Sequence, residues 1–322
     1  MSVQAPSAVI LVRPAHFTPN GATAIDNAFQ SVDATRTTPQ IARDAWLEVT
    51  RVAEALEAAG VTVHLFDDEE TTRPDSVFPN NWISTHQGGR LAIYPMFSPS
   101  RRSERRADII EELKREYRVQ DLIDYSGLEY DNIFLEGTGA MVLDHSNRLA
   151  YVARSHRADP LALERFCTHF GYEPMAFDAT DATGLAVYHT NVMMCIATDF
   201  AMIGLDMIRD AGRRAEVAER LTAPGRALID LSHEQVASFA GNAIELQGRD
   251  GRILALSTRA NASLTSEQRA IIEDSCIILA VDVPTIELAG GSVRCMIAGI
   301  HLDRRPKRAQ AAGVGQSMTA AN

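Results

Sequence analysis

The sequence predicts an α/β fold in which similar units close into a ring, and three observations lead to this prediction. Short apolar runs occur in pairs around tight polar turns, and each pair is followed by a helix-like segment and one more apolar run. Equivalent positions recur at a nearly fixed period. The last unit lacks its helix and final strand, and segments of these kinds stand at the start of the chain.

The period is visible at the residues that open the units. Trp82, Ala140, Val192, Ala243 and Val293 follow one another at intervals of 58, 52, 51 and 50 residues. A fixed period near fifty residues favours a closed circular array over a chain of two domains. A ring leaves no solvent-exposed terminal repeat, and its inner strands converge on one central site. The alternative is an ordinary α/β sheet in which the spacing is a coincidence.

The first complete unit shows the pattern. Strands are expected over 81–86 and 91–94, because two apolar runs flank the turn 87–90, whose central residues are both glycine. The segment 101–117 has helical periodicity and dense charge, and the apolar run 119–125 closes the unit as a strand.

The next three units repeat this order of two strands, a helix and a strand. In the second we expect strands over 139–143 and 149–153, a helix over 160–170 and a strand over 173–177. In the third we expect strands over 191–196 and 200–205, a helix over 212–221 and a strand over 226–230. In the fourth we expect strands over 242–246 and 253–257, a helix over 265–275 and a strand over 276–283.

The fifth unit is divided between the two ends of the chain. The segment 293–300 supplies strands, and a strand over 8–12, a helix over 38–59 and a strand over 62–66 supply the rest. We therefore expect one domain over residues 1–303. The tail 304–322 is basic and then small and polar, a composition that predicts disorder.

Composition and charge exclude several classes of protein. The net charge of −11 argues against nucleic acid and anionic membranes as partners. No apolar run approaches the ~20 residues of a membrane-spanning helix, and the first residues do not form a signal peptide. The four cysteines include no CxxC pair, so free thiols in the reducing cytoplasm are expected. For the oligomeric state, a homodimer is the commonest arrangement among soluble oligomers.

Cys295 is the residue with the most informative surroundings. It follows Gly290-Gly291-Ser292-Val293-Arg294 and precedes an apolar stretch. The glycine pair allows close approach of the backbone, and a thiol between such a turn and a short strand is well placed to be a nucleophile at the lip of a cleft. Cys167 and Cys276 fit the core instead.

A base and an orienting acid are found at the openings of two other units. His189 can accept and return protons near neutral pH, and Glu136 can hold its ring and favour the imidazolium form. In a ring these openings face one cavity. Cys195 lies six residues after His189, but a single pair of this kind is weak evidence for a metal site, and no metal or other cofactor is expected.

The motifs Leu135-Glu136-Gly137, His189-x-Asn191 and Gly290-Gly291-Ser292-x-x-Cys295, in this order, resemble those of the guanidine-modifying (pentein) superfamily. That superfamily includes arginine deiminases, dimethylarginine dimethylaminohydrolases and amidinotransferases. The likeness runs from about Arg13 to Leu302 and is greatest to bacterial citrulline-utilisation hydrolases, which are related to arginine deiminases.

The resemblance implies a five-bladed α/β propeller of ββαβ repeats around a central channel, in agreement with the period. It also implies a covalent mechanism without a cofactor, in which Cys295 is the nucleophile, His189 the general acid and base, and Glu136 its paired acid. The loop that contains Asp75 resembles the acidic loop that binds guanidinium groups. Arg157 resembles a residue that binds the α-carboxylate of the substrate, and Arg101 or Arg102 is a second contact of that kind.

Two positions depart from the pattern of the superfamily. Asn81 and Asn191 stand where arginine deiminases commonly have carboxylates. Two acids neutralise a guanidinium group and two amides do not, whereas an amide can both donate to a ureido oxygen and accept from its N–H group. A desolvated guanidinium without a counter-ion costs several kcal/mol. The expected reaction is therefore hydrolysis of citrulline, or of arginine through citrulline, to ornithine with release of ammonia.

Other functions remain open at this stage. A deiminase or a dimethylarginine dimethylaminohydrolase would stop at citrulline, and an amidinotransferase would need an amine acceptor. From another class, a non-catalytic binding propeller would leave Cys295 without a chemical role. A papain-like protease is disfavoured because its cysteine precedes its histidine in the chain.

Overall fold

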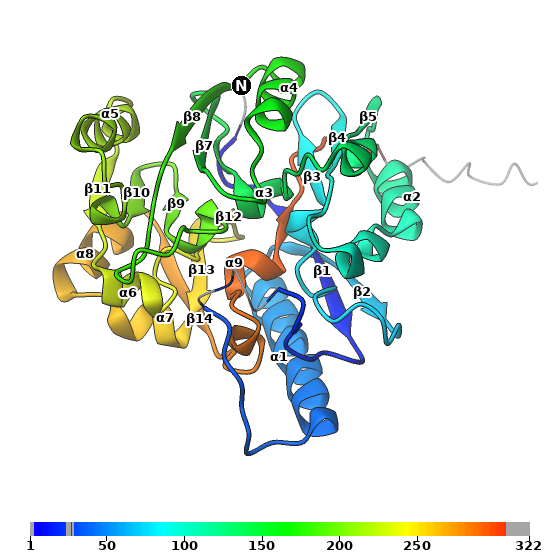
Figure 1. The fold of residues 1–322 in the computed structure, drawn as a ribbon. Coiled ribbons are helices and arrows are strands. Elements are labelled where there is room, and N and C mark those ends of the chain that lie inside the picture. Colours follow the sequence, from blue (N-terminus) through cyan, green and yellow to red (C-terminus); the bar gives the residue numbers. More distant parts are fainter. Residues whose placement is uncertain (1–2, 24–26, 28, 307–322) are drawn as a thin grey trace, which may run out of the picture.

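The computed structural model describes residues 3–23, 27 and 29–306 and has five small sheets of three strands each, arranged around a centre. Figure 1 shows the sheets following one another around the molecule in the order of the chain. The predicted five-bladed α/β propeller is therefore confirmed.

Each blade has its own set of three strands. The first two blades contain β3 (Ile83–His86), β4 (Arg90–Ile93) and β5 (Asp121–Asp124), then β6 (Val142–Asp144), β7 (Leu149–Ala153) and β8 (Glu173–Phe177). The next two contain β9 (Met194–Ile196), β10 (Phe200–Ile203) and β11 (Ala227–Asp230), then β12 (Ile244–Gln247), β13 (Arg252–Ser257) and β14 (Ile277–Val281). The last contains β15 (Ala298–Gly299), β1 (Ala8–Pro14) and β2 (Thr62–Asp68).

The same pairing recurs in every blade. The middle strand is antiparallel to one neighbour and parallel to the other, as β4 is to β3 and β5. In the last blade the two ends of the chain meet, since β1 pairs antiparallel with β15 and parallel with β2. The antiparallel edge strands β3, β6, β9, β12 and β15 contact neighbours across blades and surround the axis. Closure through the chain ends removes the exposed terminal repeat, as predicted.

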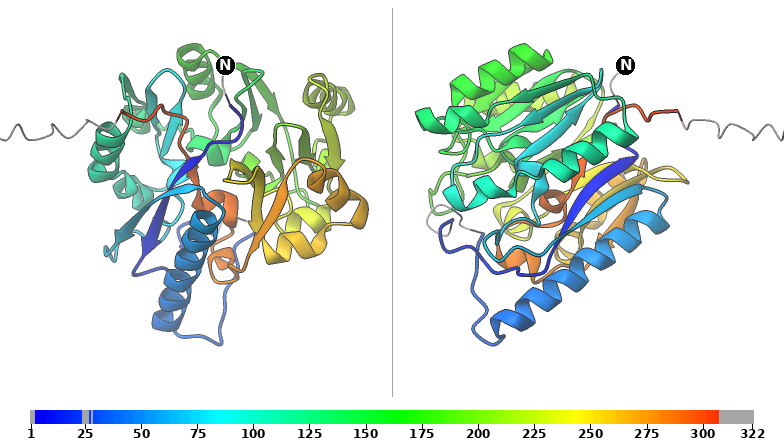
Figure 2. Two further views of the ribbon diagram at one scale, coloured as in Figure 1. Left: turned by 180° about the vertical axis from the view of Figure 1, so that it is seen from behind. Right: turned by 90° about the vertical axis from the view of Figure 1, so that its right-hand side faces the viewer.

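Helices connect the second and third strands of the blades and lie on the outside, as Figure 2 shows for the long helix of the last blade. They are α1 (Thr38–Ala58), α2 (Ala107–Glu116), α4 (Pro160–Phe170), α5 (Ala211–Thr222) and the pair α7 (Thr258–Ser263) and α8 (Ser266–Glu273), with the short α6 (His233–Ala237) after β11. Local signals explain their limits. In α4, the Asp159 side chain caps the first turn, and Gly171 ends the helix in the left-handed conformation with a φ of 69°.

The openings of the units differ from the prediction. The residues expected to begin strands form short helical turns instead, namely η1 (Pro79–Asn81), α3 (Gly137–Ala140), η4 (Thr190–Val192) and α9 (Val293–Met296). Backbone hydrogen bonds close these turns, for example from Cys295 to Ser292 over 2.9 Å. Gly, Asn and Thr are common in the first three of these segments, and such residues favour turns over strands. The fixed period of the sequence is therefore the period of these turns.

Two further segments differ in detail. The helix expected over 101–117 is divided into a 3₁₀ segment, η2 (Pro99–Glu104), and α2. The tail predicted to be disordered begins with ordered residues, because the Arg305 backbone donates to Glu116 at the end of α2 over 2.9 Å. The rest of that tail, 307–322, lies outside the described residues.

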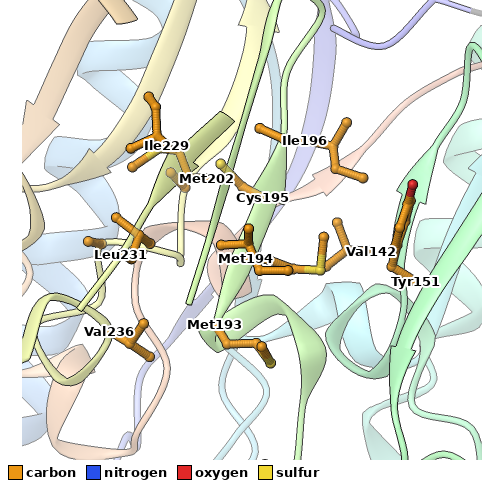
Figure 3. Close-up of a cluster of buried hydrophobic side chains, with 14 of the residues drawn as sticks. Val142, Tyr151, Met193, Met194, Cys195, Ile196, Met202, Ile229, Leu231 and Val236 are labelled. Atoms are coloured by element: carbon orange, nitrogen blue, oxygen red, sulfur yellow. The ribbon is translucent and has the colours of Figure 1, made fainter. Parts of the chain in front are cut away.

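The core lies between neighbouring blades. Figure 3 shows part of the largest cluster, in which Met194 lies between Val142 of one blade and residues of the next. Full burial of a side chain of this size contributes about 1.5–3 kcal/mol, so packing of this kind fixes the blades against one another. Within the described part of the chain, no helix is both long and apolar enough to cross a lipid bilayer.

Candidate active site

The turns that open the inner strands bring the predicted site residues together. Cys295 lies in α9, His189 directly precedes η4, and Glu136 directly precedes α3. Cys295 and His189 line the same cavity although 106 residues separate them in the chain. Figure 1 shows α3 and α9 near the middle of the ring. The arrangement follows from the repeat, because equivalent turns of a ring point toward one axis.

His189 and Glu136 form a buried pair. The Nε2 atom of His189 lies 2.8 Å from Oε2 of Glu136, whose side chain has no exposed surface. Burial by itself would raise the pKa of Glu136, but Arg157, the hydrogen bond from His189 and Arg101 outweigh it and hold the pKa well below its ordinary value. The carboxylate is therefore ionised at neutral pH and orients the imidazole.

The imidazole of His189 is held neutral by its surroundings. Burial lowers the pKa of His189 below its ordinary value, and the hydrogen bond and charge of Glu136 oppose this effect only in part. A neutral imidazole can accept a proton from a thiol or a water molecule. The position suits a general base.

Gly139 explains the glycine-rich sequence that follows Glu136. A Cβ atom at this position would lie 2.2 Å from the side-chain amide of Asn81 and 2.9 Å from Nδ1 of His189. Real Cβ contacts are essentially never this short, so only glycine allows the amide and the imidazole to lie side by side.

Two side-chain amides hold the sulfur of Cys295. Asn191 Nδ2 donates to Sγ over 3.3 Å, and Asn242 Nδ2 donates to it over 3.2 Å. The Asn242 oxygen accepts from the backbone N–H groups of Ser292, over 3.2 Å, and of Cys295, over 3.4 Å. Two amide N–H groups therefore point at the sulfur atom of Cys295.

Arg101 lies at the centre of an ionic network. Its guanidinium donates to the carboxylate of Glu104 over 3.1 and 2.9 Å and lies 3.6 Å from Asp75 and 3.7 Å from Glu136. When the Asn81 amide is oriented by its neighbours, its oxygen accepts from Arg101 over 2.9 and 3.2 Å. Burial would lower the pKa of Arg101, but the three carboxylates raise it, so the guanidinium stays charged. Burial raises the pKa of Glu104, against the effect of Arg101.

Arg157 and Asp75 line the same cavity. The Arg157 guanidinium lies 5.1 Å from the centre of the Tyr188 ring and 3.4 Å from Oε2 of Glu136. Asp75 accepts a hydrogen bond from Asn20 over 2.8 Å. The cavity thus contains both signs of charge, a composition that suits an amino acid with its own two charges.

Arg102 has a different position from Arg101. Its guanidinium donates to the carbonyl of Met96 over 3.2 Å and lies 3.3 Å from Glu129, and its side chain is 33% exposed. Arg101, in contrast, lines the cavity. The sequence does not decide between these two arginines. The structure places Arg101 beside the other site residues, and it does not place Arg102 there.

Four residues of the site were not identified from the sequence: Asn20, Glu104, Tyr188 and Asn242. Asn242 carries a signal that could have found it, because it directly precedes the opening residue of the fourth unit, as Asn81 and Asn191 do in the first and third units. Glu104 looks like part of a solvated, charged helix face in the sequence, yet its side chain is buried.

Comparisons with known proteins agree with this geometry. The family model described as N,N dimethylarginine dimethylhydrolase, eukaryotic, matches residues 13–302. A comparison with curated proteins finds no significant match.

Three solved structures are similar in fold. The product-bound N-terminal domain of ArgZ, an arginine dihydrolase from the ornithine–ammonia cycle in cyanobacteria, has 14% identity and a TM-score of 0.69 over 91% of this chain and 97% of that one. A mutant of AgrE in complex with L-arginine has 12% identity and a TM-score of 0.70 over 93% of this chain and 41% of that one. A mutant of DDAH from Pseudomonas aeruginosa complexed with citrulline has 14% identity and a TM-score of 0.61 over 92% and 100%. The chain spans about 40% of the longer ArgZ and AgrE chains.

Proposed function

Because the chain belongs to the N,N-dimethylarginine dimethylhydrolase family, whose members in the pentein superfamily hydrolyse guanidino C–N bonds, we propose a specific reaction for it. The substrate is citrulline, and hydrolysis of its ureido group gives ornithine, ammonia and carbon dioxide. Arginine enters the same route after its guanidino group has been hydrolysed to give citrulline. The proposal on substrate rests on the charges of the cavity, and the proposal on mechanism rests on Cys295, His189 and Glu136.

The mechanism has two halves. His189 takes the proton of the Cys295 thiol, and the thiolate attacks the ureido carbon. The bond from that carbon to the side-chain nitrogen breaks as His189 returns the proton, so ornithine leaves and a carbamoyl group remains on sulfur. His189 then deprotonates a water molecule that attacks the same carbon. The C–S bond breaks, and the carbamate released decomposes to ammonia and carbon dioxide.

Glu136 and the two amides support these steps without changing covalently. Glu136 keeps the ring of His189 oriented and stabilises the imidazolium that forms in each half. Asn191 and Asn242 donate to the sulfur and stabilise the thiolate. General acid–base catalysis of this type contributes typically ~10²–10⁴-fold to the rate.

One observation carries the choice of a ureido substrate: the carboxylate that lines the cavity and the two beside it already face guanidinium groups of the protein itself. Arg101 lies against Asp75 and Glu104, and Arg157 lies against Glu136. A cationic guanidino substrate would have to displace Arg101 to gain a counter-ion, at a cost of several kcal/mol for the charges left unpaired.

The amides in and beside the cavity suit a neutral ureido group. Asn81 lines the cavity beside His189. Asn191 donates to Sγ of Cys295, and its Oδ1 is buried without a hydrogen-bond partner among the described residues. An amide oxygen of this kind accepts from an N–H group of a ureido ligand, and an amide nitrogen donates to its oxygen. Neither contact requires a counter-charge.

A second candidate is the hydrolysis of a methylated arginine to citrulline. The description of the matching family model favours it. It requires Arg101 to move from Asp75 so that this carboxylate can bind the guanidinium of the substrate.

The test is incubation of purified protein with L-citrulline, L-arginine and asymmetric dimethyl-L-arginine, with ornithine, citrulline and dimethylamine measured by mass spectrometry and ammonia measured enzymatically. We expect ornithine and ammonia from citrulline. Citrulline that accumulates from arginine or dimethylarginine without any ornithine would refute the ureido proposal and support the second candidate. A Cys295→Ala variant controls for contaminating activity, and a Cys167→Ala variant controls for the loss of a buried thiol.

A further inference from the structure

A second cavity lies inside the ring, and residues of all five inner strands line it. Its volume is about 50 Å³, and its wall includes Ser84 of β3, Leu143 of β6, Met194 of β9, Glu245 of β12 and Gly299 of β15. Figure 3 shows part of the apolar wall, with Val142, Met194, Cys195 and Ile196. By the same measure one water molecule needs about 10–15 Å³, so the cavity has room for a small ion.

Arg294 brings a charge to this cavity. It directly precedes Cys295 in α9, but its side chain lines the second cavity and not the one that contains Cys295 and His189. The guanidinium has five N–H donors, and within the described part of the chain the structure gives it one acceptor, the carbonyl of Ile297 at 3.0 Å. The rest of its hydrogen-bonding capacity is left for a ligand.

Among the described residues, Arg294 has no carboxylate as a counter-ion. No carboxylate forms an ion pair with it in the part of the chain that the structure describes. Glu245 lines the same cavity, but its carboxylate accepts from the backbone and hydroxyl of Thr198, over 2.8 and 2.6 Å, and from Cys276 over 3.3 Å. A partly buried guanidinium without a partner is unfavourable, and an anion in the cavity reduces that penalty.

Three imidazoles complete the lining of the cavity. His86, His145 and His301 belong to it, and the rings of His145 and His301 stack with centres 3.9 Å apart. Nδ1 of His86 is buried and, among the described residues, has no hydrogen-bond partner. Burial lowers the pKa of all three, that of His301 to about 4, so they are neutral N–H donors at neutral pH.

We propose that this central cavity binds a small monovalent inorganic anion, of the size of a halide or bicarbonate, against the guanidinium of Arg294 and beside the imidazoles of His86 and His301. The site is separate from the substrate cavity and does not depend on which substrate the enzyme hydrolyses. The ligand would lie behind the segment that carries Cys295, on the opposite side from the substrate.

Bromide is the probe for the direct test, because its anomalous scattering identifies it in a crystal. Crystals of the wild-type protein soaked in sodium bromide are expected to show an anomalous peak in contact with the Arg294 guanidinium. Crystals of Arg294→Gln are expected to lack it. Density for water alone beside Arg294, with bromide present and bound elsewhere on the surface, would overturn the proposal.

A solution measurement keeps the test independent of crystals and of activity. Thermal unfolding is followed against increasing bromide, and separately against bicarbonate, at constant ionic strength. A rise of the midpoint that follows the logarithm of the anion concentration above Kd, and reaches ~2 °C at ten times Kd, is expected for the wild type and for Arg154→Gln, which removes an exposed arginine. Arg294→Gln and the charge-conserving Arg294→Lys separate loss of the charge from loss of the fold. Equal responses of the wild type and Arg294→Gln would refute the site, and a response to only one salt would identify which anion it prefers.

Discussion

Asn242 connects the nucleophile to the turn that carries it, because its amide nitrogen donates to Sγ of Cys295 over 3.2 Å while its oxygen accepts from the backbone N–H of the same residue over 3.4 Å. The same nitrogen donates to the carbonyl of Asn191 over 2.8 Å. One side chain from the fourth unit therefore links the openings of the third and fifth units at the sulfur.

Asn242→Ala is expected to destabilise the thiolate form of Cys295 and to lower kcat/KM by about 10- to 100-fold. The reason is that the sulfur and the backbone N–H of Cys295 both lose a hydrogen-bond partner. The measurement is the rate of alkylation of Cys295 by iodoacetamide at one fixed, neutral pH. We expect a slower rate in the variant. Asn147→Ala, at the exposed turn after β6, is the control and keeps the rate of the wild type. An unchanged rate in Asn242→Ala would show that the amide does not act on the thiol.

Alkylation is expected to be selective for one of the four cysteines. Burial raises the pKa of Cys167, Cys195 and Cys276 to about 12 each, so these thiols stay protonated and unreactive at neutral pH. We expect 2-chloroacetamidine to modify Cys295 alone, as measured by peptide mass spectrometry of the native protein. Cys295→Ser should remain unlabelled under the same conditions, and labelling of any of the three other cysteines at a similar rate contradicts the expectation.

Glu136→Gln is expected to reduce activity at least ~100-fold, because the amide does not stabilise the imidazolium of His189 as a carboxylate does. It should also change the dependence of stability on pH. The folded pKa of Glu136 lies below its unfolded value, so the stability that this carboxylate contributes is present above the unfolded value and is lost as the pH falls.

The stability prediction is checked by denaturant unfolding between pH 7 and pH 3. The wild type should lose free energy of unfolding more steeply than Glu136→Gln as the pH falls through the unfolded value of about 4.5. The variant should be less stable at pH 7, by ~3 kcal/mol, because Arg157 and Arg101 lose a buried partner. Parallel curves for the two proteins would mean that folding does not lower the pKa of Glu136.

Gly139→Ala tests the close packing of the site. The added methyl group would lie 2.2 Å from the amide of Asn81 and 2.9 Å from His189, so one of these side chains has to move. We expect a loss of ~1–3 kcal/mol in the free energy of unfolding and at least a tenfold loss of kcat. Gly127→Ala is the matched control, since no atom lies within 4 Å of the Cβ position there. Equal kinetics for the two variants would show that the packing at Gly139 is dispensable.

Much of the fold could be predicted from the sequence because each blade is a local structure. The helix limits around Pro160–Phe170 follow from a capping aspartate and a terminal glycine that lie next to the helix in the chain. The strand openings could not be predicted in the same way. Their apolar residues, such as Trp82 and Val293, suit a buried strand and a buried helical turn equally, and periodicity does not distinguish the two over so few residues.

The sequence by itself determined the number of units, their order and the three motifs that contain Glu136, His189 and Cys295, because a repeat and a short motif are properties of neighbouring residues. Only the tertiary structure decided that Arg101 and not Arg102 faces the cavity, that Asn242 contacts the sulfur, and that Arg294 faces the other way from Cys295. Adjacent residues in a turn point to different sides, and which side meets the centre depends on how five blades pack around one axis.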